Sequence, residues 1–212
     1  MRGPLGDSRA EEELFTSIGL SPVAAVITDS RRPDNPIVTV NDAFCRLTGY
    51  GRDEIVGRNC RFLAGPDTDP AAQAVLRQAI RDRRPALTQL VNYRKDGTAF
   101  RNAVMIAPVL ADDGRVAYFL GSQMEVGDDR AAFDSRRREA GALVAGLTAR
   151  QRQVLANIIA GYRNKQIAGF LGIDEKTVKM HRASLLARLG VRSSAQAVRI
   201  GVEAGLELSG PD

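Results

Sequence analysis

The sequence is poor in the features that make disulfide frameworks, metal sites and membrane spans. Only two cysteines occur among 212 residues, Cys45 and Cys60, too few for a disulfide framework and wrongly spaced for a metal site. No apolar run approaches the roughly 18 residues that a membrane-spanning helix needs. The polar start MRGPLGDSRAEEE lacks the apolar stretch of a secretory signal. We therefore expect a cytoplasmic protein with no bound metal, in a reducing compartment where either thiol can stay free.

Other absences bear on catalysis. His181 is the only histidine, and no nucleophile or carboxylate partner for it is apparent in the sequence. The glycine fingerprint of NAD-binding domains is missing, and there are no internal repeats or low-complexity tracts. These absences predict that the chain is not an enzyme.

The net charge of +5 is unevenly distributed. Residues 147–212 contain ten lysines and arginines against five acidic residues, so this segment alone accounts for the excess of +5. The preceding 146 residues are therefore balanced. This asymmetry favours a polyanion such as DNA as the partner of the C-terminal segment, although a basic solvated face alone is common.

The pattern of strands and turns between residues 21 and 127 predicts an α+β domain. Strand-favouring segments and turn formers place strands at 23–29, 36–41, 86–94, 99–110 and 116–126. Glycine-broken or periodic segments place helices at 41–50, 51–63 and 70–83. The order predicts an antiparallel sheet that carries helices on one face, preceded by an extension at 1–20 with a short helical run.

The segment Gly57–Asp69, GRNCRFLAGPDTD, resembles the signature of light-oxygen-voltage (LOV) domains, a branch of the PAS fold. NDAFCRLTGY before it and VNYRKDG, FRN and YFLGSQ after it agree in order and spacing. The resemblance implies a sensor at 21–127 that binds flavin mononucleotide (FMN) between the sheet and the short helices. Ala64 departs from the pattern, since many family members have glutamine there.

The resemblance also implies a role for each residue of the flavin site. Cys60 would bond to a flavin ring carbon after blue-light absorption, Asn59 would contact the ribityl chain, and Gln123 would contact the ring nitrogen N5. The remaining residues would clamp the phosphate (Arg61, Arg77), bond the polar ring edge (Asn92, Asn102) or line the ring pocket (Val26, Thr28, Leu63, Leu90, Val104, Ile106, Phe119). Amides that donate and accept suit such a ring edge, and guanidinium forks suit a phosphate.

A change of pattern follows the sensor. Residues 128–146 predict a linker helix with Phe133, Leu143 and Val144 as apolar contacts. Residues 147–212 predict four helices, with Thr148, Asp174 and Ser193 as N-caps and Gly172 in a tight turn. The segment Leu147–Leu206 resembles the LuxR-type helix-turn-helix DNA-binding domain.

In that resemblance, Glu175–Leu189 is the recognition helix. Val178, Leu185 and Leu189 would face the core, and an exposed face with Ala183 would enter the major groove of double-stranded DNA. We predict that the DNA contacts are made by Lys176, Thr177, Lys179, Met180, His181 and Arg182, of which Lys176, His181 and Arg182 are better placed for phosphates. The last helix, from Ser194, would mediate dimerisation.

The sequence thus predicts a blue-light-regulated transcription factor. In the dark the sensor sheet would cover the last helix and keep the chain monomeric, and light would release the effector for dimerisation and DNA binding. Three alternatives stay open: a ligand- or redox-sensing PAS-type regulator without photochemistry, a flavoenzyme, and a photoreceptor in which light releases DNA.

Overall fold

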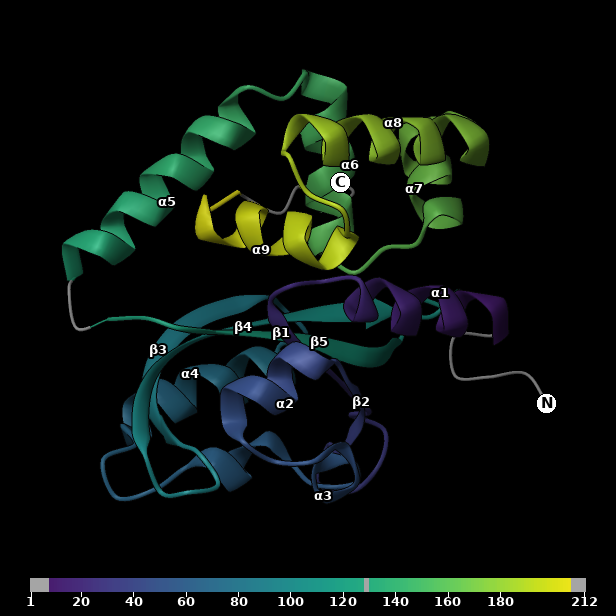
Figure 1. Cartoon of the computed structure of the whole chain (residues 1–212). Coiled ribbons are helices and arrows are strands. Elements are labelled where there is room, and N and C mark those ends of the chain that lie inside the picture. Colours follow the sequence, from purple (N-terminus) through teal and green to yellow (C-terminus); the bar gives the residue numbers. More distant parts are fainter. Residues whose placement is uncertain (1–7, 128–129, 207–212) are drawn as a thin grey trace.

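The computed structural model describes residues 8–127 and 130–206, which form a sensor below and a helical effector above (Figure 1). The sensor begins with helix α1 (Ser8–Gly19). Its sheet contains β1 (Ala24–Thr28), β2 (Ile37–Val40), β3 (Ala86–Tyr93), β4 (Ala99–Leu110) and β5 (Val116–Glu125). The strands are antiparallel in the order β2-β1-β5-β4-β3. The helices after β2 are α2 (Asp42–Thr48), α3 (Arg52–Ile55), the 3-10 helix η1 (Cys60–Leu63) and α4 (Pro70–Arg81).

The effector, as far as residues 130–206 describe it, is built of helices. Its elements are α5 (Arg130–Ala145), α6 (Ala149–Ile159), α7 (Asn164–Leu171), α8 (Glu175–Arg188) and α9 (Ser194–Glu203). The predicted fold class, an α+β sensor followed by an all-α domain, is confirmed. Residues 1–7, 128–129 and 207–212, at the ends of the predicted segments, lie outside the described residues.

Helix capping follows the sequence closely. The side chains of Thr148, Asp174 and Ser193 each accept a hydrogen bond from a backbone N–H in the first turn of their helices. Gly172 ends α7 in the left-handed conformation, with φ of 62°. Val178, Leu185 and Leu189 are buried as predicted. The Gly172 turn and the Asp174 cap set the angle between α7 and α8.

One prediction for the linker helix is wrong. Leu143 is 41% exposed, whereas Val144 and Ala140 on α5 are buried. Since α5 contacts α9, the apolar side of α5 is set by that contact, which a single-helix pattern does not reveal. The side chain of Phe133 lies outside what the structure describes.

The two faces of the sheet have different partners. The helices from α2 to α4 lie on one face, and α1 and the effector lie on the other (Figure 1). Successive residues of β5 point to opposite faces, so Gln123 lies on the side of α2–α4 while Ser122 lies on the side of the effector. On the face of the sheet that the effector covers, here called the outward face, Met105 and Leu120 belong to one hydrophobic cluster with Val198 of α9.

Asn41 fastens the sensor's N-terminal segment. Its side chain is buried, accepts hydrogen bonds from the N–H groups of Ala25 and Phe44, and donates to the carbonyls of Ile18, Ser21 and Val23. It therefore caps α2 and also satisfies carbonyls at the end of α1.

We expect Asn41→Ala to destabilise the folded chain by about 2–4 kcal/mol, because several buried backbone groups lose their only side-chain partner. Urea unfolding followed by circular dichroism measures the loss. Asn41→Asp keeps the acceptor and loses the donors, so its stability should lie between those of the unmodified chain and Asn41→Ala. A loss below about 1 kcal/mol for alanine would contradict this role.

Within residues 8–127 and 130–206, none of the helices combines the length and apolarity needed to cross a membrane. The same residues contain no group of three or more His, Cys, Asp or Glu side chains arranged to hold a metal ion.

Candidate functional site

A cavity lies between the sheet and the short helices of the sensor. Every residue predicted for the flavin site lines it except Asn102, which lies just behind the lining. The lining is mostly apolar around the centre, with side chains from β1, β3, β4 and β5. Ala64, noted above as a departure from the family pattern, also lines the cavity, and four lining side chains were missed from the sequence: Asn35, Gln73, Leu76 and Ile80. The turn after β1 and the face of α4 supply these four, and sequence spacing does not show that these elements meet.

Cys60 opens the 3-10 helix at the edge of this cavity. Asn59 precedes it as the N-cap and accepts a hydrogen bond from the backbone N–H of Arg61 at 3.0 Å. Burial raises the pKa of the Cys60 thiol to about 12, so the sulfur keeps its proton at neutral pH. The site therefore presents a neutral thiol rather than a thiolate nucleophile.

Three amides form a buried network beside the cavity that Cys60 lines. The Asn102 amide nitrogen donates to the side-chain oxygens of Asn92 and Gln123, at 2.9 Å in both cases. Asn92 in turn donates to the carbonyl of Leu63 at 3.1 Å. The Asn102 side-chain oxygen is buried and has no hydrogen-bond partner within the described chain. A ligand with an N–H group at its edge would satisfy that oxygen, as the polar edge of a flavin does.

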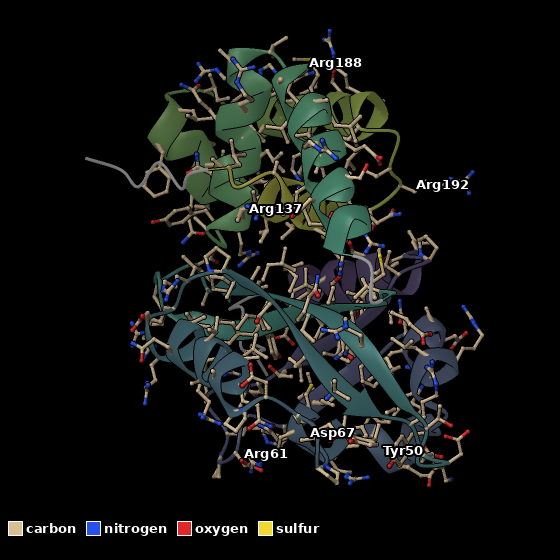
Figure 2. All side chains as sticks on the ribbon, turned by 90° about the vertical axis from the view of Figure 1, so that its left-hand side faces the viewer. Tyr50, Arg61, Asp67, Arg137, Arg188 and Arg192 are labelled. Atoms are coloured by element: carbon tan, nitrogen blue, oxygen red, sulfur yellow. The ribbon has the colours of Figure 1, made fainter. Side chains whose placement is uncertain are left out.

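The mouth of the cavity carries the polar groups suited to a ribityl phosphate. Arg61 and Arg77 lie there with Asn59, and Arg61 forms an ion pair with Asp34. In Figure 2 Arg61 lies at the end of the sensor farthest from the effector. The buried side-chain oxygen of Asn35 has no hydrogen-bond partner in the described part of the chain. The residues present therefore fit a flavin nucleotide.

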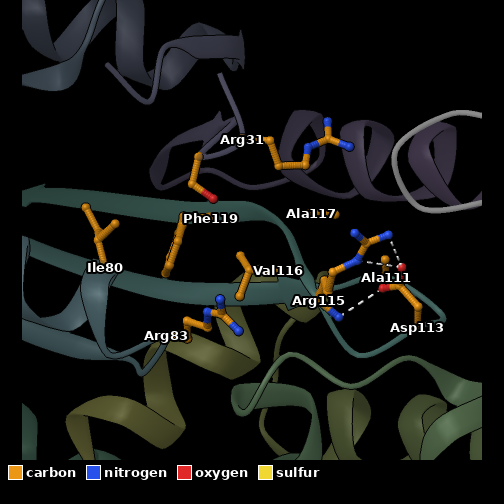
Figure 3. Close-up of a pocket in the computed structure, with 10 residues that line it drawn as sticks. Arg31, Ile80, Arg83, Ala111, Asp113, Arg115, Val116, Ala117 and Phe119 are labelled. Atoms are coloured by element: carbon orange, nitrogen blue, oxygen red, sulfur yellow. Dashed lines mark hydrogen bonds and ion pairs between the residues drawn. The ribbon is translucent and has the colours of Figure 1, made fainter. Parts of the chain in front are cut away.

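A second cavity adjoins the first, and the two share Ile80 and Phe119 as a wall (Figure 3). Its polar lining consists largely of arginines, and Arg115 is paired with Asp113 at 2.6 Å. It lacks the thiol and the amide network of the first cavity. The first cavity is therefore the candidate site for a flavin.

The predicted DNA-binding residues divide into two groups. Lys176, Lys179 and Met180 are exposed on α8, and Met180 is 60% exposed. Lys179 also pairs with Glu175 at 3.2 Å. Thr177 is half-buried, and its N–H and hydroxyl both donate to Asp174, so it belongs to the helix cap.

Arg182 and His181 are half-buried at the middle of α8. The guanidinium of Arg182 donates to the side-chain oxygens of Asn164 and Ser194, at 2.6 Å in both cases. Arg182 therefore links α7, α8 and α9 in this arrangement, and a phosphate would have to share or replace those bonds.

The effector meets the sensor through polar as well as apolar contacts. Arg199 of α9 is buried, donates to the Ser122 hydroxyl at 2.8 Å and pairs with Glu203 at 2.7 Å. Burial lowers the pKa of Arg199, and the charge of Glu203 opposes that shift. At the β4–β5 hairpin, Arg163 pairs with Asp112 at 2.9 Å, and Gln166 donates to the carbonyl of Ala111 at 3.0 Å.

Sensor and effector approach each other backbone to backbone at Gly161, which has φ of 94°. The N–H of Leu110 donates to the carbonyl of Gly161 at 2.9 Å. A Cβ atom at position 161 would lie 2.6 Å from the carbonyl oxygen of Pro108. Only glycine fits this contact without movement of the backbone.

Comparison with known families matches both parts of the chain. A PAS domain model matches residues 22–127, and the model of bacterial regulatory proteins of the luxR family matches residues 145–200. The chain therefore belongs to the PAS domain family and carries a luxR-family helix-turn-helix domain after the sensor. Its PAS domain is of the LOV type, as the following relatives show.

A blue-light-activated histidine kinase of Erythrobacter litoralis is 40% identical over 84% of this chain and 48% of its own length. Phototropin-2 of Oryza sativa is 43% identical over 56% of this chain and 13% of its own length. The light-state structure of the blue-light photoreceptor Aureochrome1 LOV is 42% identical, with a TM-score of 0.51, and covers 56% of this chain and 93% of that one. The chain thus spans about half or less of the curated relatives it matches.

Proposed function

We propose that this protein is a blue-light-regulated DNA-binding transcription factor with FMN as its chromophore. The single observation that carries the proposal is the position of β5. One face of this strand supplies Gln123 to the thiol-containing cavity, and the other face bonds through Ser122 to α9 of the effector. A chemical change at the cavity is therefore one residue away from the contact that holds the effector.

The residues of the chain hold the chromophore and respond to it. When bound, FMN would supply a ring that absorbs blue light, and Cys60 would hold its thiol where the sulfur can bond to that ring. Asn92 and Asn102 fix the polar ring edge, and the apolar lining excludes water from the thiol. Because the thiol is neutral, it brings its own proton to the site, and no separate base is needed.

Gln123 is the proposed reporter of that bond. Its side-chain oxygen accepts from Asn102 at 2.9 Å, and its side chain is buried. The proton from the thiol would change the ring nitrogen N5 beside Gln123 from a hydrogen-bond acceptor into a donor. A glutamine amide can rotate to present its oxygen in place of its nitrogen. The rotation disturbs the pairing of Gln123 with Ala24 and Val104 and thereby the sheet face that α9 covers.

Release of α9 is the proposed output. The proposed dark, monomeric state has the arrangement described above, in which the sheet covers α9 and Arg199 donates to Ser122. In the light, α9 would pair with a second copy and α8 would enter the major groove of double-stranded DNA. Moving such an equilibrium from 1:99 to 99:1 requires a bias of roughly 5.5 kcal/mol.

The proposal includes a division of the chain and the absence of catalysis. The extension is 1–20, the sensor 21–127, the linker 128–146 and the DNA-binding domain 147–212. The protein acts as a regulator and not as an enzyme, although some of its relatives are named histidine kinases. A PAS-type regulator without photochemistry remains the second candidate, because the PAS match alone does not require light.

A DNA-binding titration of the purified chain in darkness and under blue light tests this function. We expect a yellow protein whose flavin absorption bleaches reversibly and whose affinity for DNA rises on illumination. A colourless protein would favour the second candidate, and a fall in affinity on illumination would reverse the proposed direction.

Gln123→Leu should separate photochemistry from output. Because leucine cannot exchange donor and acceptor, we expect flavin bleaching to persist while most of the light-induced gain in DNA affinity is lost. Absorption spectroscopy and the DNA titration measure the two effects. Gln123→Asn, which keeps an amide, should retain more of the response, and an unchanged response in the leucine variant would exclude Gln123 as the reporter.

A further inference from the structure

Helix α1 belongs to the sensor but lies against the effector. Its inner side is anchored by buried Ile18 and by Phe15, whose ring packs edge-to-face on Tyr118 with centroids 5.9 Å apart. The Tyr118 hydroxyl donates to Glu11 at 3.1 Å, and Asn41 holds the last turn. Figure 1 shows α1 on the outward side of the sheet beneath the effector helices, and α1 contacts α9.

A cavity of about 570 Å³ lies between α1 and the helix-turn-helix. Glu13, Leu14 and Ser17 of α1 line one side, and Lys165, Lys179 and Arg182 line the other. Lys165 is in the first turn of α7, and the other two belong to α8, the proposed recognition helix. The cavity is thus bounded by the basic groups that a DNA backbone would meet on approaching α7 and α8.

Three acidic side chains line this cavity: Asp112 pairs with Arg163, Glu175 pairs with Lys179 within α8, and Glu13 is the one contributed by α1. Burial lowers the pKa of Arg182, and the negative charge of Glu13 opposes that shift, so the two side chains interact electrostatically. Glu11 is directed to Tyr118, and Glu12 does not line the cavity. Of the acidic run Glu11–Glu13 in α1, Glu13 is the residue that lines this cavity.

We propose that α1 is a built-in acidic competitor of DNA, in which Glu13 takes the electrostatic place of a backbone phosphate beside Lys165, Lys179 and Arg182. This inference rests on the proposed function and adds to it a second restraint besides the sheet–α9 contact. The sheet would cover the dimerisation helix, while α1 would cover and partly neutralise the DNA-facing groups. Opening of the effector would remove both restraints together.

If Glu13 competes with DNA, the DNA affinity should depend in a particular way on salt and on whether the effector is closed or open. In the closed state Glu13 lowers the affinity of the basic groups for phosphate, and in the open state it is distant from them. Removing its charge should therefore raise DNA affinity in darkness and change it little in the light. Allosteric couplings of this kind are typically at least about fivefold, and salt should weaken the effect because exposed charges are screened.

The test uses the full chain with Glu13→Lys and Glu13→Gln, and with Glu12→Lys as the matched control. Affinity for a double-stranded DNA fragment is measured by fluorescence anisotropy in darkness and under blue light, at low and high salt. Glu12→Lys makes the same change in net charge on the same helix without facing the cavity. Any general gain from added positive charge therefore appears in both lysine variants and in both light states.

We expect Glu13→Lys to reduce the light-to-dark ratio of affinities by about fivefold or more, with Glu13→Gln intermediate and Glu12→Lys close to the unmodified chain. Equal ratios for Glu13→Lys and Glu12→Lys would overturn the role of α1. That failure is distinct from failure of the proposed function, in which the unmodified chain itself shows no light-dependent DNA binding. Flavin bleaching kinetics in each variant verify that the sensor is intact.

Discussion

Cys60→Ala is expected to abolish the light response completely. The variant should still bind flavin, because the amide network and the arginines at the cavity mouth do not depend on the sulfur. Without the thiol no bond to the ring can form, so blue light should cause no reversible bleaching. DNA affinity should then be the same in darkness and in light, at the dark value of the unmodified chain.

Cys45→Ala is the matched control for this experiment. Cys45 is a half-buried residue of α2 that packs beside Phe44 and does not line the flavin cavity. The Cys45→Ala variant should keep both the reversible flavin bleaching and the light-induced DNA binding. A Cys60→Ala protein that retained the full change in DNA affinity would show that the signal arises without the sulfur bond.

Gly161→Ala should produce the opposite phenotype, strong DNA binding in the dark. The added methyl group would lie 2.6 Å from the Pro108 carbonyl oxygen and 3.2 Å from the Leu110 side chain, both of the sensor. Because the obstacle is backbone, it cannot rotate away, and the contact between hairpin and effector must open. We expect dark affinity for DNA to approach the light value, measured by the same titration.

Gly190→Ala separates the clash from backbone strain. Gly190 also has positive φ, 69°, but nothing lies within 4 Å of its hypothetical Cβ atom. Alanine at either position pays a conformational cost of roughly 1–2 kcal/mol, yet only position 161 meets the sensor. If both variants bound DNA equally in the dark, general loosening of the effector would explain the effect and the interdomain contact would not.

Much of the fold followed from the sequence because it is encoded locally. Thr148, Asp174 and Ser193 each cap the helix that follows, and alternation in β5 separates Gln123 from Ser122. The flavin-site residues could be named because the signature around Cys60 and the separate segments before and after it agree in order and spacing with the LOV pattern. Whether they bind flavin stays a prediction, although the cavity brings almost all of them together.

The contacts between sensor and effector could not be predicted in the same way. The exposure of Leu143 and the internal hydrogen bonds of Arg182 depend on how helices pack against one another, which the pattern of a single helix does not specify. The same holds for Glu13, because Lys165, Lys179 and Arg182 on the other side of the cavity belong to the effector, far away in sequence. Arg199 is another such case, because an arginine in the apolar stripe of α9 has a reason only once Ser122 and Glu203 are in place.

The central claim, that a bond at Cys60 frees the effector from the sheet, can be measured at the amide of Leu110. In the structure this N–H donates to the Gly161 carbonyl across the boundary between sensor and effector. Hydrogen exchange at this amide, followed by NMR in darkness and under blue light, reports opening of that contact. We predict slow exchange in the dark and fast exchange in the light for the unmodified chain, and slow exchange in both for Cys60→Ala. Equal rates in darkness and light for an unmodified chain that bleaches normally would contradict the account.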